Sequence, residues 1–263
     1  MNLNPVSMWR LLLAGLALVL WWRFFTQRGA GLAVTVGGTL LLWGLYRALA
    51  AWQLRSGLRV IREQPFPPFL RGKMRSLYPE LDDKALHDVE GGLRQFFMAC
   101  ARSKGRFVAM PSRVVDALWH EFILHTRGYD AFCRRAFGRM LHHTPAQALG
   151  TPTDSQARKD GLRRAWFWSC KEEGIDPLKA ARLPLLFALD AALAVPGGYR
   201  YVPDCNLLGA DRGGTHCATD FSCGSSCGSG SDDGSSADAG GSGDGGGDGG
   251  GDGGGGCGGG GGD

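Results

Sequence analysis

Residues 115–145 read VDALWHEFILHTRGYDAFCRRAFGRMLHHTP, and this stretch determines how the rest of the chain is interpreted. Apolar residues recur at helical spacing on both sides of Gly128, which predicts two helices. Ser112 supplies a cap for the first helix, and the second extends to about Leu141, with Pro145 as a stop. The stretch holds four of the six histidines: His120, His125, His142 and His143.

These histidines suggest a metal site, although not a zinc protease. The protease signature needs two histidines four residues apart, whereas HEFILH separates them by five. Zinc or iron could still bind if His125 met a ligand from the second helix, because imidazole and thiolate are suitable ligands. Alternatively, His125 is a hydrogen-bonded residue at the core edge and the others lie on the surface. The candidate ligands are His120, His125, Cys133, His142 and His143, and the candidate structural or interaction core is Asp116, Trp119, Tyr129 and Phe132.

The same stretch resembles the glycine-rich domain-containing protein-like family. A second matching block, RLPLLFALD, covers residues 182–190 and is followed by Tyr201, Asp204 and Cys205. The resemblance covers roughly residues 81–205 and then the glycine-rich end, and it implies a helical domain without an established catalytic role. The residues that carry it in the first block are Val115, Asp116, Trp119, His120, residues 122–126, Tyr129, Phe132, Cys133, Phe137, Gly138, His142, His143 and Pro145.

The first fifty residues predict a transmembrane hairpin with helices at about residues 8–25 and 29–50. Residues 29–46 carry no charge, and 18 helical residues extend about 27 Å, close to the thickness of the hydrocarbon core. A cleaved signal peptide fits less well, because residues 21–23 (WWR) lack a small-residue cleavage site. Five arginines on the side of the termini against two in the connector place the following domain in the cytoplasm, so we expect a two-pass protein of the inner membrane.

The remaining chain divides into three parts. Residues 53–80 form a basic linker, either lying along the bilayer surface or acting as a plain connection. Residues 81–205 predict an all-α domain of about five helices, starting after the caps Asp82 and Asp83. Residues 206–263 form a Gly/Asp/Ser-rich tail that we expect to be disordered. The whole chain has a net charge of +4. No motif supports nucleic-acid binding, so we expect no such partner.

The eight cysteines fall into two groups. Cys100, Cys133 and Cys170 lie on apolar helix faces and predict buried thiols. Those at the glycine-rich end, including Cys217, Cys223 and Cys227, match no common zinc knuckle and should be free thiols in the cytoplasm.

Two functions follow from the sequence. The favoured one is a membrane-anchored protein-interaction or scaffolding module, with the lipid bilayer and an unknown protein as partners. The alternative is a zinc- or iron-dependent enzyme or sensor built on the histidine and cysteine candidates. No nucleophile elbow, phosphate-binding loop or pair of carboxylates supports a particular reaction, so an enzyme is the less favoured reading.

Overall fold

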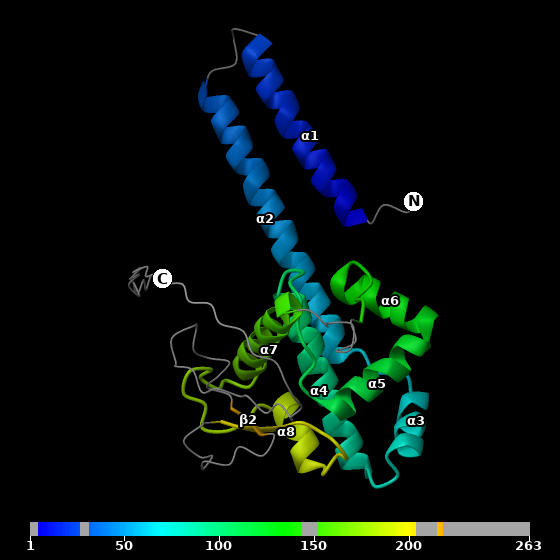
Figure 1. The fold of residues 1–263 in the computed structure, drawn as a ribbon. Helices are drawn as coiled ribbons and strands as arrows, with labels where there is room; N and C mark the ends of the chain where they lie inside the picture. Colours follow the sequence, from blue (N-terminus) through cyan, green and yellow to red (C-terminus); the bar gives the residue numbers. More distant parts are fainter. Residues whose placement is uncertain (1–4, 27–31, 144–151, 204–214, 218–263) are drawn as a thin grey trace, which may run out of the picture. The chain divides into compact units, whose positions relative to one another are not determined.

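The computed structural model describes residues 5–26, 32–143, 152–203 and 215–217, all within one compact unit of the chain. These residues are mostly helical, which confirms the all-α prediction (Figure 1). Two three-residue strands pair in parallel, with Tyr201 opposite His216. The predicted tail lies outside the described residues apart from the second strand. The elements are α1 (Pro5–Thr26), α2 (Leu32–Glu63), α3 (Phe69–Leu77), α4 (Asp83–Arg102), α5 (Arg113–Leu124), α6 (Thr126–Phe137), α7 (Pro152–Glu172), α8 (Leu185–Ala192), β1 (Arg200–Val202) and β2 (Thr215–Cys217).

The helices α1 and α2 pack side by side, but the prediction that they cross a membrane is wrong. In the part of the chain that the structure describes, no helix is both long and apolar enough for a membrane span. Arg10 and Arg23 leave only twelve residues between them in α1. A span needs about 20 predominantly apolar residues. The expected two-pass protein of the inner membrane, with its domain in the cytoplasm, is corrected accordingly.

Residues 53–80 contribute to the core, although we expected a linker. The helix α2 continues to Glu63, and the buried side chains of Ile61, Phe66, Leu70 and Met74 join the core of the following helices. At Gly57, an added Cβ would lie 2.2 Å from the carbonyl oxygen of Ala136 in α6. This glycine therefore allows the two helices to approach closely.

The helix α4 occupies the centre of the fold and packs against α2, α5, α7 and α8. Its N-cap is Asp82, as predicted, and the carboxylate accepts a 2.7 Å hydrogen bond from the backbone N–H of Ala85. Its buried face includes Phe96 and Phe97, which contact the ring of Trp119 in α5. This aromatic cluster fixes α5 against α4.

The helix α6 ends at Phe137, earlier than the sequence suggested. Gly138 caps it with φ of 69°, in the left-handed region that favours glycine. Residues 139–143 therefore leave the helix axis and return towards α5 instead of extending α6. This turn decides where the last two histidines lie.

The helices α7 and α8 close the other side of the core. The indole N–H of Trp166 donates a 3.0 Å hydrogen bond to the carbonyl of Pro177, and its ring meets Phe187 edge-on at 5.2 Å. Phe187 in turn contacts Tyr201 of β1 at 4.9 Å, so the strand pair is attached to α8.

Candidate metal centre

Three metal-binding side chains meet at the surface of α5. Asp116 and His120 lie one turn apart on this helix, and His143 comes from the segment that follows α6. The Nε2 atom of His143 lies 3.0 Å from Oδ1 of Asp116, and Nδ1 of His120 lies 3.8 Å from Oδ2. The two imidazole rings are 4.3 Å apart. The three side chains could share one ion.

A hydrogen-bonded pair of aromatic residues holds the segment that carries His143. The indole N–H of Trp119 donates to the hydroxyl of Tyr129 at 3.0 Å, and this hydroxyl donates to the carbonyl of Leu141 at 2.6 Å. Leu141 is two residues from His143, whose ring also packs 4.6 Å from that of Trp119. Tyr129 and Trp119 therefore position the third ligand from beneath.

Burial keeps this support protonated. Desolvation raises the pKa of the Tyr129 hydroxyl far above its ordinary value and also raises that of the neighbouring Cys133 thiol. Tyr129 can therefore remain a hydrogen-bond donor to Leu141 at neutral pH. The Cys133 side chain is fully buried, belongs to the core and is not part of the cluster.

The N-terminus of α5 is fixed by Asp190, a buried carboxylate of α8 with 2% exposure. One of its oxygens accepts hydrogen bonds from the Ser112 hydroxyl at 2.7 Å and from the Val114 N–H at 3.2 Å. The other accepts from the backbone N–H groups of Arg113 at 2.7 Å and Tyr199 at 2.9 Å. These bonds satisfy the free N–H groups of Arg113 and Val114 in the first turn of α5 and so help to set the position of Asp116.

The cluster has the donor set of a catalytic metal site. Two imidazole nitrogens and one carboxylate oxygen suit zinc with an open position, or non-haem iron. Ligand atoms each about 2.1 Å from an ion, at angles of about 90–110°, lie roughly 3.0–3.4 Å apart. The 3.0 Å pair fits directly, and because the His120 side chain is 50% exposed it can rotate to close the 3.8 Å separation.

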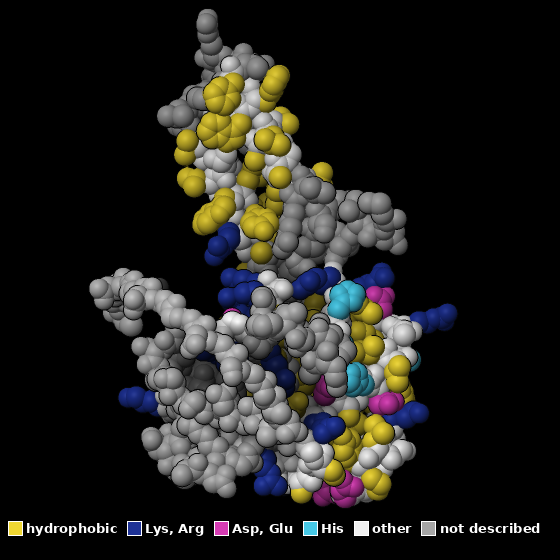
Figure 2. Space-filling view, viewed as in Figure 1, with side chains coloured by type: hydrophobic (Ala, Val, Ile, Leu, Met, Phe, Trp, Pro, Cys, Tyr) yellow, Lys and Arg dark blue, Asp and Glu magenta, His cyan; other side chains and the backbone are white. Residues whose placement is uncertain are grey.

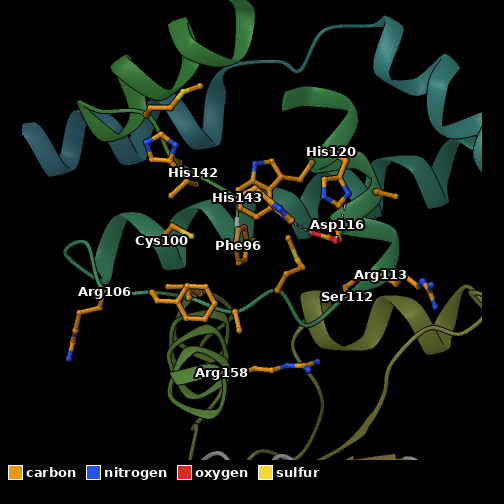
Figure 3. Close-up of a pocket in the computed structure, with 18 of the residues that line it drawn as sticks. Phe96, Cys100, Arg106, Ser112, Arg113, Asp116, His120, His142, His143 and Arg158 are labelled. Atoms are coloured by element: carbon orange, nitrogen blue, oxygen red, sulfur yellow. Dashed lines mark hydrogen bonds and ion pairs between the residues drawn. The ribbon is translucent and has the colours of Figure 1, made fainter. Parts of the chain in front are cut away.

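The cluster faces a cavity of about 630 Å³ (Figure 3). The cavity is bounded by α4, residues 105–112, α5, residues 139–143 and α7. The side chain of His143 is 13% exposed and that of Asp116 is 31% exposed, so solvent and a small molecule can reach the cluster from this side.

The structure thus brings together only two of the five predicted ligands, His120 and His143. His142 lines the same cavity, but it is not part of the cluster. His125 lies at the junction of α5 and α6, where its ring packs edge-on against Phe69 at 5.1 Å. Trp119, Tyr129 and Phe132 are buried.

Asp116 is the ligand that the sequence interpretation assigned to the core instead. A signal for it was available, because Asp116 and His120 are four residues apart and so share a helix face. A carboxylate and a histidine at this spacing can bind one ion as two histidines can.

The cysteine predictions differ in outcome. Cys133 and Cys170 are buried free thiols as predicted, whereas the free thiol of Cys100 is only half-buried. Cys217 in β2 is disulfide-bonded and not the thiol that we expected. A disulfide forms only where a second cysteine lies close, and the chain spacing did not reveal this pairing. Cys223 and Cys227 lie outside the described residues.

A sequence profile described as UCP032817-like matches residues 56–221, which is well over half of the chain and includes the whole cluster. No curated protein and no solved structure matches the chain. The profile match does not test the resemblance to the glycine-rich domain-containing protein-like family, which stays a prediction.

Proposed function

The chain belongs to the UCP032817-like family, and we propose that it is a metal-binding protein whose centre is formed by Asp116, His120 and His143. The single observation that carries the proposal is the convergence of their ligand atoms within 4.8 Å of one another. This convergence favours the enzyme or sensor reading of the sequence, with zinc or iron as the ion.

The number of ligands and the adjoining cavity also indicate a metal centre with a free coordination position. Structural zinc sites are closed by four protein ligands, whereas catalytic sites keep a position for water or a substrate. Among the described residues, the cluster offers three ligands and borders the cavity. A bound ion would therefore have coordination positions directed towards a small molecule in that cavity.

The test is the metal content of the purified full-length chain, measured by elemental mass spectrometry after dialysis against zinc or ferrous ion. We expect close to one ion per chain, lost in a His143→Ala variant. His142→Ala is the matched control, because it removes a neighbouring imidazole of the same cavity wall that is outside the cluster. Thermal unfolding of both variants shows whether the fold is kept. A chain that binds no ion, or a His143→Ala variant that retains it, would make the cluster a plain Asp–His hydrogen bond.

A second candidate function is the protein-interaction role that the sequence favoured. It is supported by large apolar side chains that are exposed on α1 and on the first part of α2, visible in yellow in Figure 2. Exposed apolar patches of this kind mark interaction surfaces. Leu40, Leu41 and Trp43 are 61%, 75% and 61% exposed.

Sedimentation of the full-length chain tests whether this surface drives association. We expect concentration-dependent association that the triple replacement of Leu40, Leu41 and Trp43 by serine removes. A monomer at all concentrations, or association that is unchanged in the triple variant, would argue against this second function.

A further inference from the structure

The cavity beside the candidate metal centre has the size of a small-molecule site. Its volume of about 630 Å³ falls within the range of roughly 300–1,000 Å³ that is usual for ligand pockets. Figure 3 shows the histidine cluster on one wall and Arg158, from α7, across from it. A molecule held in the cavity could contact both.

The charge of the cavity wall is strongly positive. Four arginines line it against one carboxylate, that of Asp116, and with neutral histidines the described wall has a net charge of +3. Three of these arginines are exposed at the rim, and only Arg158 is half-buried. Seven arginines elsewhere in the described chain lie within 4.0 Å of a carboxylate, but in that same part of the chain none of the four cavity arginines forms such an ion pair. The cavity arginines are Arg106, Arg113, Arg139 and Arg158.

Arg158 contacts a residue that is attached to the core. Its Nη2 atom lies 3.5 Å from the hydroxyl of Tyr199, and the backbone N–H of Tyr199 donates to the buried Asp190. Arg158 is half-buried, although it has no carboxylate partner among the described residues. A half-buried guanidinium without a carboxylate partner is suited to bind an oxyanion.

Apolar side chains also line the cavity. Phe107, Met110, Trp119 and Leu141 line it. A simple inorganic ion would leave these side chains without a partner, whereas the carbon skeleton of an organic ligand would contact them.

From these features we infer that the cavity binds a small organic phosphate, with its phosphate group at Arg158 and the rest of the molecule extending towards the metal centre. A phosphomonoester concentrates about 1.5 to 2 negative charges on one group, which suits a wall of charge +3 better than a single carboxylate does. Guanidinium groups match phosphate oxygens with paired hydrogen bonds. The inference rests on the proposed function, since it names the ligand class of the same site.

The experiment is calorimetric titration of the full-length chain with phenyl phosphate, benzoate and phenol. We expect phenyl phosphate to bind at least about tenfold more tightly than benzoate, and phenol not to bind. Arg158→Gln should weaken phenyl phosphate by about tenfold or more, because a charge-assisted hydrogen bond is lost. Arg134→Gln is the matched control, since this exposed arginine pairs with Asp130 outside the cavity, and it should bind as the unaltered chain does.

Each outcome bears on the inference separately from the proposed function. Equal binding of benzoate and phenyl phosphate, no binding of phenyl phosphate, or an Arg158→Gln variant that melts and binds normally would overturn it. Metal content is measured on the same samples. Phosphate binding that depends on Arg158 without a bound ion would uphold the anion site and remove the metal centre. A bound ion without phenyl phosphate binding would uphold the metal centre and overturn the anion site.

Discussion

Replacing Asp190 with asparagine should strongly destabilise the domain, because this carboxylate ties α8 to the start of α5. Each oxygen accepts two hydrogen bonds, one pair from Ser112 and Val114 and the other from Arg113 and Tyr199. Asparagine keeps one oxygen and turns an amide N–H₂ towards the two remaining donors. Two hydrogen bonds to a charged acceptor are lost at about 1.5–3 kcal/mol each, so the free energy of unfolding should fall by about 3–6 kcal/mol.

Urea unfolding of the full-length chain, followed by circular dichroism, measures this change. With a slope of about 2 kcal/mol per molar urea, the midpoint should fall by roughly 1.5–3 M. Asp83→Asn is the matched control, since its side chain is 77% exposed and its pairing with Arg75 should contribute at most about 1 kcal/mol. If Asp190→Asn shifted the midpoint no more than Asp83→Asn does, the buried carboxylate would not hold α5, and the reasoning would fail.

Three further predictions concern packing, pH and thiol chemistry. Gly57→Ala should lower the melting temperature, because the new Cβ would meet the carbonyl oxygen of Ala136 at 2.2 Å. The control Gly72→Ala places its Cβ in open space and should stabilise α3 by about 0.5–1 kcal/mol. Equal effects at the two glycines would contradict the close approach of α2 and α6. Burial raises the pKa of Glu172, but hydrogen bonds from Arg62 and Arg102 outweigh this and hold it below the usual 4.5. The ionised Glu172 therefore stabilises the fold fully above pH 4.5, and this stabilisation is lost as the pH falls through the lower pKa of the folded state. Between about pH 5 and pH 3, the Glu172→Gln variant should lose less unfolding free energy than the unaltered chain. Parallel pH profiles of the two proteins would refute this. Burial also raises the pKa of the Cys133 thiol, and that of Cys170 to about 12, so alkylation at pH 8 mapped by mass spectrometry should modify these two buried cysteines only in denaturant. Labelling of the native protein at either of the two would show that the core opens.

The candidate site divides into a part that could be read from the sequence and a part that could not. Asp116 and His120 share a helix face at a spacing of four residues, which is a local pattern. His143 is 27 residues from Asp116, and no spacing rule connects them. Their contact depends on the left-handed turn at Gly138 and on the hydrogen bond from Tyr129 to Leu141.

The prediction that α1 and α2 cross a membrane was wrong for a different reason. Hydropathy along the chain marked the right helices, but the arginines within them limit the apolar segments. In α1 the apolar stretch between Arg10 and Arg23 is shorter than a span requires. The sequence also treated residues 53–80 as a linker, whereas Ile61, Leu70 and Met74 are buried in the core.

The sequence alone determined the helical class, the apolar faces of the helices and the caps Asp82 and Ser112, because these depend on neighbours within one or two turns. Only the tertiary structure decided which histidines meet, which arginines share a cavity and where Asp190 binds. Such contacts join residues far apart in the chain, and they form because burying α4 among α2, α5, α7 and α8 fixes the positions of those helices.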